Sequence, residues 1–431
     1  MSEGERRAAD HGSALKQQDR GEPPAMGYRE LLGRPGIRPW LLVTLAAKLP
    51  VAMAPLALVF LVRETSGGYT LGAVLGGAYV VGEVVGAPLL GARLHGARLH
   101  GARLRRELSL GLLGGAGAFA GLAFCHSAPP ALAVALAFLA GAAPSAHAGG
   151  LRALLVAAVP EHGVARALSV ETTLSQAIWA VAPAAVAFLA LGAAPGAPLG
   201  LAACCAALAA AGVRMLAAAD TDGEQAGQGA AEPPSRGRAL AAGWPVYLTS
   251  AAAMALLATA ELVLPALLES RGLPVSWSGP LLTVFSVASV VGGLLYGARR
   301  WPGGPRAQSL VLLVAMAAFV ALIAVLPGLV GIAVGLVLAG AFKSGVMVTR
   351  NLSLRERVPA GMLAAGYSLM YAVQGVGYSL TASLTAVILA NAEPGTAVLC
   401  GAALTLLLTL VSASAEYRSH GAQLEAPTDR L

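Results

Sequence analysis

The chain has 431 residues, of which 57% are hydrophobic and only 12% are charged, and its mean hydropathy is +0.71. Soluble domains carry about 25% charged residues, so this composition excludes a soluble globular protein and predicts an integral membrane protein. The net charge of +7 does not indicate nucleic-acid binding, because the basic residues are distributed in small groups between apolar runs.

Residues 1–38 are polar and lack the apolar core and cleavage site of a signal peptide. We expect a mostly disordered cytoplasmic tail there, with a surface helix near residues 28–32. Apolar runs follow, most of them close to the ~20 residues that a membrane-crossing helix requires. There are twelve of them: Pro39–Val62, Thr70–Ala92, Leu108–Cys125, Ala131–Gly150, Ala165–Leu191, Leu199–Ala218, Trp244–Leu268, Ser278–Ala298, Ala307–Leu326, Leu329–Val348, Gly361–Ala390 and Thr396–Ala415.

Basic residues gather on one side of the predicted membrane. Of the 29 lysines and arginines, 24 fall in the N-terminal tail, in the loops after even-numbered runs or at the run ends beside those loops, and in the C-terminal tail. This bias predicts that both termini are cytoplasmic. The longest internal loop, residues 219–243, is polar and is predicted to be a flexible linker. We therefore expect six-helix bundles over residues 39–218 and 244–416, followed by a cytoplasmic tail at residues 417–431.

Two sequence repeats relate the halves of the chain. The segment VVGAPLLGAR at Val84–Arg93 recurs as VVGGLLYGAR at Val290–Arg299, and LAGA at Leu139–Ala142 recurs at Leu338–Ala341. The offsets, 206 and 199 residues, differ by no more than a loop. One half is therefore a diverged copy of the other, which is the internal symmetry expected of a secondary transporter.

With twelve spans, a central cytoplasmic linker and a basic loop after the second span, the chain resembles the major facilitator superfamily over residues 39–415. In that family the loop carries glycines, basic residues and an Asp. Glycine and basic positions are matched here by Gly86, Gly91, Arg93, Arg98 and Arg103. The Asp, which in the family pairs with a neighbouring helix to hold one gate, is absent, and the tandem repeat GARLH-GARLH-GARLR stands in its place.

The resemblance implies an all-α fold of two pseudo-symmetric six-helix bundles that work by rocker-switch alternating access, as in bacterial drug-efflux members. The pair Ala182-Pro183 is similar to the antiporter motif of the family's fifth helix, although alanines replace its glycines. In this fold, helices 1, 4, 7 and 10 line the cavity and helices 2, 5, 8 and 11 form its sides.

Charged residues inside a bilayer cost about 2.5–3.5 kcal/mol each on insertion scales, so they usually face a cavity or a partner. At a rise of about 1.5 Å per residue, three of them reach the cytoplasmic half of the N-terminal bundle: Lys48, Glu83 and Glu171. We expect them to form a paired cluster. It would either exchange protons, since desolvation favours a neutral carboxyl group, or act as a static ion pair that holds helices 1, 2 and 5.

Three further side chains each allow two interpretations. Glu261 has no basic residue near it on helix 8 or 11, so it either binds protons or a cationic substrate, or faces an outer vestibule. Lys343 either meets an anionic group or extends toward the cytoplasm beside Arg350. His147 either relays protons or packs through a hydrogen bond. A fourth residue, Arg152, is expected to lie at the membrane interface.

Polar residues recur at three- and four-residue spacing on the four predicted side helices, which places them on one face of each. We expect the following residues to line the cavity, with helix packing by small residues as the alternative: Tyr79, Gln176, Trp179, Ser289, Lys343, Tyr371, Gln374 and Tyr378.

Few amides and only 5% aromatic residues argue against a sugar importer. A mostly apolar cavity with a few polar groups favours an amphipathic organic molecule, so we expect proton-coupled efflux of a drug or metabolite. The alternatives are an uptake permease for a metabolite or organic ion, and a non-transporting sensor or scaffold. No enzyme motif, metal spacing or cofactor site is evident. We expect a monomer in the cell's inner (plasma) membrane, with lipid, protons and a small molecule as partners and no nucleic acid.

Overall fold

The computed structural model describes residues 26–62, 68–93, 101–124, 129–216, 236–299 and 301–424, and within these ranges it contains helices and no strands. Twelve of its helical segments are long and apolar enough to cross a membrane, which confirms the predicted spans. In chain order they are α3 (Ile37–Val62), α4 (Gly68–Arg93), α5 (Gly101–Phe124), α6 (Pro130–Ala142) with α7 (His147–Ala157), α8 (Val164–Gly192), α9 (Ala197–Met215), α11 (Trp244–Ser270), α12 (Ser278–Ala298), α13 (Pro305–Val325), α14 (Gly328–Arg357), α15 (Leu363–Asn391) and α16 (Pro394–Leu424).

Two short helices lie outside the spans, α2 (Tyr28–Gly33) and α10 (Arg236–Ala241). The helix expected near residues 28–32 is present as α2. It is docked rather than lying free on the surface, because Met26 and Leu31 are only 2% and 1% exposed. The rest of the expected tail, residues 1–25, and most of the expected linker lie outside the described residues.

Some helix boundaries differ from the prediction. The tenth span was expected to end at Val348, but α14 continues to Arg357 and buries Arg350 and Asn351. An apolar run predicts only the part of a helix that lies within the lipid. The helix itself can continue beyond that run, because polar side chains are also compatible with helical structure. The fourth span is broken between α6 and α7, where Pro144 lacks the backbone N–H that would continue the helix.

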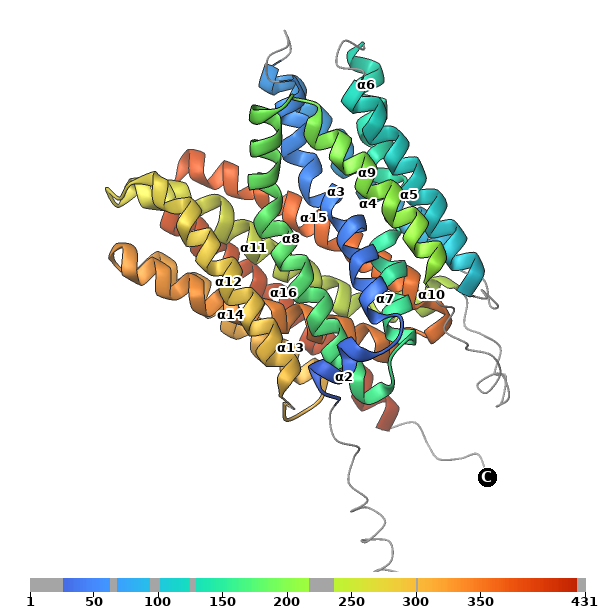
Figure 1. Cartoon of the computed structure of the whole chain (residues 1–431). Coiled ribbons are helices and arrows are strands. Elements are labelled where there is room, and N and C mark those ends of the chain that lie inside the picture. The colour runs from blue at the N-terminus through green and yellow to red at the C-terminus, as the bar shows by residue number, and fades with distance from the viewer. Residues whose placement is uncertain are drawn as a thin grey trace, which may run out of the picture.

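The helices form two bundles. In the N-terminal bundle α3 packs on α8 and α9, α4 on α6, and α5 on α9; in the C-terminal bundle α11 packs on α15 and α16, and α14 on α12 and α13. The bundles meet where α8 packs on α12 and α14, and where α4 and α7 pack on α15. Figure 1 shows them close together near α2, α7 and α13 and spread apart at the other end. We call these the closed end and the open end.

The sequence repeats mark the same packing contact in each bundle. A Cβ atom added to Gly86 on α4 would lie 2.5 Å from the carbonyl oxygen of Ala142, and one added to Gly292 on α12 would lie 2.0 Å from that of Ala341. Both distances are too short for a side chain. Each VVG segment therefore packs its glycine directly on the backbone of the LAGA segment of the same bundle, as small residues do in membrane helices.

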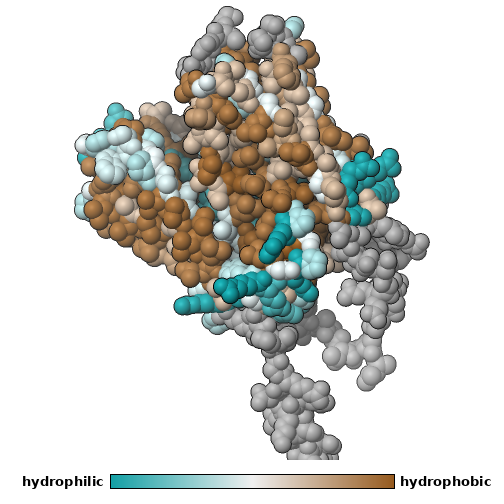
Figure 2. Space-filling view, in the orientation of Figure 1, coloured by the Kyte–Doolittle hydropathy of each residue, from teal (hydrophilic) through white to brown (hydrophobic). Residues whose placement is uncertain are grey.

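The outward faces of the helices are apolar. Phe124, Phe188 and Val330 are each at least 77% exposed, and a broad hydrophobic surface covers the bundles in Figure 2. An exposed apolar surface of this extent is unfavourable in water and is the surface expected to contact lipid.

Candidate functional site

Glu83 lies between two tyrosine hydroxyls at the boundary of the bundles. Tyr371 on α15 donates a hydrogen bond to its Oε1 atom at 3.2 Å, and Tyr79, one turn earlier on α4, donates to the same oxygen at 3.4 Å. The Tyr371 bond joins α4 of the N-terminal bundle to α15 of the C-terminal bundle. Tyrosine hydroxyls can both donate and accept hydrogen bonds, so they can bind either the ionised or the protonated carboxyl group.

Glu261 has a similar arrangement in the C-terminal bundle. Tyr378 on α15 donates a hydrogen bond to its Oε2 atom at 3.2 Å. The charge of Lys343 on α14 also interacts with that of Glu261. The Lys343 side chain is 9% exposed and its Nζ atom lies 5.0 Å from the centre of the Phe285 ring. The basic group near Glu261 thus comes from α14, the tenth span, and not from helix 8 or 11.

Lys48, Arg152 and Glu171 form a separate buried network. Lys48 donates from Nζ to Glu171 Oε1 and, at 2.6 Å, to Ser175 Oγ. Arg152 donates from Nη2 to the same Glu171 oxygen at 2.9 Å. The Glu171 side chain is only 2% exposed. One carboxylate thus binds two cations and holds α3, α7 and α8 together.

The expected cluster of Lys48, Glu83 and Glu171 is therefore formed only in part: Lys48 pairs with Glu171, whereas Glu83 accepts its hydrogen bonds from two tyrosines. Glu83 faces α15, and Arg152 takes its place beside Glu171. Counting residues along a helix estimates how deep Glu83 lies in the membrane, and that depth is similar to the depth of Lys48. It does not predict the direction in which a side chain points around the helix axis.

The ion network reaches the C-terminal bundle through an aromatic contact. The Arg152 guanidinium lies over the ring of Tyr367 on α15, 5.3 Å from the centre of the ring. The negative face of an aromatic ring attracts a cation at this distance.

His147 is buried, and its Nδ1 atom lies 2.8 Å from the carbonyl oxygen of Pro144. This contact within the break between α6 and α7 agrees with the packing interpretation of His147.

One face of α15 thus connects all three groups. Tyr367, Tyr371 and Tyr378 contact Arg152, Glu83 and Glu261 respectively. With Gln374, these residues follow a spacing of four, three and four, which places them on the same side of an α-helix. Gln374 is partly exposed between Tyr371 and Tyr378.

The other expected cavity residues differ in their surroundings. Ser289 is fully buried and donates to the Gly340 carbonyl oxygen at 3.0 Å, so it joins α12 to α14 instead of lining an accessible space. Tyr79 is 1% exposed and packs on Phe119. Gln176 is partly exposed, and Trp179, one turn further along α8, is 52% exposed.

The expected gate loop is described only in part. Gly91 approaches the other bundle closely, because an added Cβ atom would lie 2.9 Å from Ser368 Cβ on α15. Arg103 is exposed at the start of α5. The side chain of Arg93 and the whole of Arg98 lie outside the described residues.

Contacts that the sequence did not reveal join the bundles at the closed end. Arg355 donates from both Nη atoms to the two carboxylate oxygens of Glu161. Arg166 on α8 donates from Nε to the Gly297 carbonyl oxygen at 2.8 Å and from Nη2 to that of Ala298 at 3.2 Å. The position of Arg355 or Arg166 in the sequence gives no indication of its distant partner.

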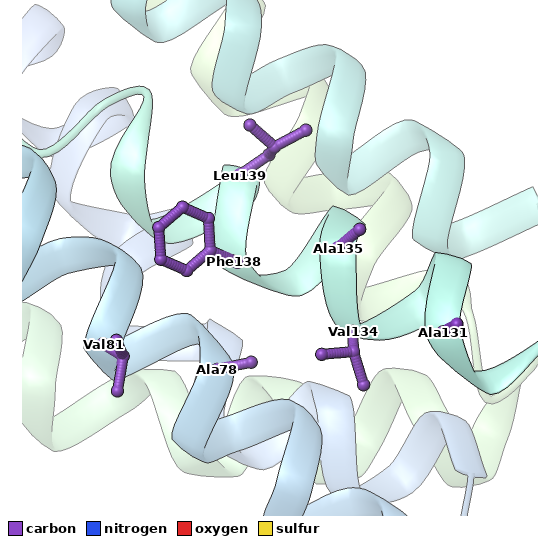
Figure 3. A pocket seen from close by; sticks show the side chains of 7 residues that line it. All are labelled: Ala78, Val81, Ala131, Val134, Ala135, Phe138 and Leu139. Carbon is purple, nitrogen blue, oxygen red and sulfur yellow. The ribbon is translucent and has the colours of Figure 1, made fainter.

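A groove of about 650 Å³ lies between α4 and α6, and none of these polar groups lines it. Figure 3 shows its side chains, all of them apolar: Ala78, Val81, Ala131, Val134, Ala135, Phe138 and Leu139. It offers no group that could bind a proton or orient a polar substrate. The candidate functional site is therefore formed by the tyrosines of α15 and the charged side chains that they contact.

A comparison with protein families matched residues 40–382 to the model of the Major Facilitator Superfamily. The chain belongs to this superfamily. The matched region spans α3 to most of α15 and so contains every residue of the candidate site. A comparison with curated proteins gave no match.

Solved structures of superfamily transporters share the fold. The human organic anion transporter MFSD10 (TETRAN) is 16% identical, with a TM-score of 0.69 over 88% of this chain and 100% of its own. A bacterial homologue of the iron transporter ferroportin in an outward-facing state is 15% identical, with a TM-score of 0.68 over 88% and 99%. The fucose:proton symporter FucP of E. coli is 16% identical, with a TM-score of 0.67 over 88% and 99%. At these identities the likeness shows the fold.

Proposed function

We propose that this superfamily member is a proton-coupled secondary transporter that exports a small amphipathic organic molecule, and that Glu83 and Glu261 bind the coupling protons. The observation that carries the proposal is the position of these two carboxylates. One lies in each bundle, and each accepts a hydrogen bond from a tyrosine of α15. The fucose:proton symporter with the same fold is a precedent for proton coupling.

Glu83 suits this role better than Glu171. Glu171 accepts hydrogen bonds from two cations, and its protonation would leave both without a counter-ion. The hydrogen bonds of Glu83 come from neutral hydroxyls, so a proton can bind there without breaking an ion pair. A hydrogen bond to an ionised group is roughly twice as strong as one between neutral groups. Protonation would therefore weaken the contact between α4 and α15, which links proton binding to movement of the bundles.

The proposal places the closed end on the cytoplasmic side. Helix α2 lies at that end (Figure 1), and Arg355 binds Glu161 there. Arg214 adjoins Val213, which belongs to the same buried cluster as Leu31 of α2. The bias of basic residues supports a cytoplasmic location for this end. The open end then faces the outside of a cell membrane, where the carboxylates could exchange protons before the bundles rock to the opposite state.

A second candidate is uptake of an organic anion. Two cations, Lys48 and Arg152, share the single carboxylate of Glu171, which leaves a net positive charge in a partly accessible network. This charge would favour an anionic group on the substrate. The human protein with the same fold is an organic anion transporter by name, which also supports this candidate.

Transport by purified protein in liposomes separates these possibilities. Ethidium serves as the amphipathic cation and fluorescein as the amphipathic anion, each measured with and without an imposed pH gradient. We expect gradient-dependent ethidium movement in the direction opposite to protons, and its loss in Glu83→Gln and Glu261→Gln. Glu269→Gln is the matched control, because Glu269 is an exposed carboxylate at the end of α11. If both site variants keep gradient-driven transport, the proton assignment is wrong.

A further inference from the structure

Helix α2 connects the two bundles although it precedes all the membrane spans. Its inner side belongs to the N-terminal bundle, where Met26 and Leu31 join a buried cluster that includes Ile37 and Trp40. A Cβ atom added to Gly163, directly before α8, would lie 3.1 Å from the Met26 sulfur. The helix is therefore fixed to its own bundle by close apolar packing.

The opposite side of α2 reaches the other bundle. The Tyr28 hydroxyl donates a hydrogen bond at 2.6 Å to the carbonyl oxygen of Leu294 in the last turns of α12. The Tyr28 ring also lies under the guanidinium of Arg166, 5.1 Å from its centre. Arg166 is 8% exposed, and this contact positions it beside the end of α12.

Arg166, which the Tyr28 ring contacts, supplies hydrogen-bond donors at the end of α12. The last four carbonyl groups of a helix have no partner within the helix. Those of Gly297 and Ala298 accept hydrogen bonds from Arg166, whereas that of Tyr296 accepts one from Trp301 of its own bundle. A cation at this position also interacts favourably with the helix dipole. The N-terminal bundle thus caps a helix of the C-terminal bundle.

The fit around this cap is tight. A Cβ atom added to Gly297 would lie 2.5 Å from both the Tyr28 hydroxyl and the Ser169 hydroxyl. Gly297 lies in the repeated VVGGLLYGAR segment, and its counterpart Gly91 also packs closely across the boundary, where an added Cβ atom would lie 2.9 Å from Ser368 Cβ of α15. The repeat therefore brings a glycine to the boundary between the bundles in both halves of the chain.

We propose that α2, with Tyr28 and Arg166, is a latch that caps the end of α12 and holds the closed end shut, and that its release regulates the change between the two conformations. The inference rests on the proposed function only in assuming that the two conformations are those of a transport cycle. When the bundles separate at this end, Tyr28 and Arg166 must leave the α12 carbonyls. Any factor that draws α2 away therefore favours opening.

The test measures the conformational balance directly, by electron–electron double resonance on the full-length protein in lipid nanodiscs. The four native cysteines are replaced by alanine, and spin labels are placed at Met215 and Gly304. Met215 is 85% exposed at the end of α9, and Gly304 has open space around it at the start of α13. A second pair at Gly192 and Gly279, both with open space, reports the width of the open end.

Tyr28→Phe removes only the hydroxyl and keeps the ring beside Arg166. We expect it to raise the ratio of separated to closed conformations about fivefold, the factor that corresponds to one typical net hydrogen bond. Tyr28→Phe combined with Arg166→Gln should raise the ratio further. The separations should move in opposite directions, longer for Met215–Gly304 and shorter for Gly192–Gly279.

Arg29→Gln is the matched control, because Arg29 is an exposed cation on the same helix, adjacent to Tyr28. We expect its distance distributions to equal those of the parent protein. Unchanged distributions in Tyr28→Phe would overturn the latch, as would an equal shift in Arg29→Gln. The readout requires no substrate or proton gradient. The latch can thus fail while Glu83→Gln still abolishes gradient-driven transport, and the reverse outcome is equally visible.

Discussion

Tyr371 donates a hydrogen bond across the boundary between the bundles to the carboxylate of Glu83, at a distance of 3.2 Å. The two residues are 288 positions apart in the chain and come from opposite bundles. This bond is therefore a point at which the protonation of one side chain can act on the contact between the two moving parts.

Glu83→Gln and Tyr371→Phe should separate proton coupling from substrate movement. Glu83→Gln keeps the shape of the side chain but removes the carboxyl group that binds a proton. We therefore expect gradient-driven transport to fall at least tenfold. Exchange of labelled for unlabelled substrate requires no net proton movement and should stay within about twofold. Tyr371→Phe removes one hydroxyl donor to Glu83, worth about 1 kcal/mol, and should give a smaller loss of gradient-driven transport. Equal losses of transport and exchange would indicate a structural role.

The sequence was sufficient for the architecture but not for the site. The twelve spans follow from apolar runs, and the repeated VVG and LAGA segments indicate two related halves. The polar face of α15, with Tyr371, Gln374 and Tyr378, also follows from spacing alone. Each of these depends on a pattern that is local in the chain or is repeated within it.

The partners of the charged residues could not be predicted, because they depend on how each helix is rotated. Glu83 points toward α15 and not toward Lys48. Arg152 reaches Glu171 from α7, which packs against α3 and α8 as well as α15. The contact of Arg166 with the end of α12 joins residues 131 positions apart, and no sequence spacing indicates it.

Glu171→Gln should destabilise the protein, because it leaves Lys48 and Arg152 without their shared carboxylate. Breaking a buried ion pair costs about 3–5 kcal/mol. We expect the lower part of that range, since the Lys48 and Arg152 side chains keep 14% and 12% exposure. The measurement is the loss of folded protein on heating in detergent, followed by size-exclusion chromatography.

A double variant checks this explanation. Glu171→Gln combined with Lys48→Met removes one cation together with the carboxylate, so it should be more stable than Glu171→Gln alone. A further decrease in melting temperature in the double variant would show that Lys48 stabilises the fold through packing and not through its charge.

Lys343→Met tests whether the fold depends on a buried cation. Lys343 is 9% exposed and lies over the Phe285 ring. Methionine has a similar length and can keep favourable contact with that ring. Lys343→Met keeps that contact but leaves Glu261 without the cation that interacts with it. We therefore expect a lower melting temperature, because removing one partner of a buried charge pair is destabilising, whereas replacing both partners is often close to neutral. A melting temperature equal to that of the parent protein would instead show that Glu261 and α11 do not depend on the charge of Lys343.

Gly141→Ala should destabilise the N-terminal bundle at the repeated contact. The new Cβ atom would lie 2.1 Å from the Tyr79 carbonyl oxygen, so α4 and α6 would have to separate. Overpacking of this kind costs about 1–3 kcal/mol. Gly77→Ala is the matched control on α4, because nothing lies within 4 Å of its added Cβ atom. It should be neutral or slightly stabilising, since alanine favours a helix over glycine by about 1 kcal/mol. Thermal unfolding of both variants in one detergent tests the difference.

Glu161→Gln should have only a small effect on stability, although it breaks a two-bond ion pair between the bundles. The Glu161 side chain is 80% exposed and that of Arg355 is 27% exposed, and solvent-exposed pairs contribute about 0.2–1 kcal/mol. Salt screens such charges over about 8 Å at physiological ionic strength. We therefore expect the melting temperature of Glu161→Gln to fall slightly below that of the parent protein in low salt and to equal it in 1 M salt. Glu393→Gln, an exposed carboxylate before α16, is the control and should show no such dependence. A large effect of Glu161→Gln that persists in 1 M salt would mean that the pair does more than join two exposed charges at the closed end.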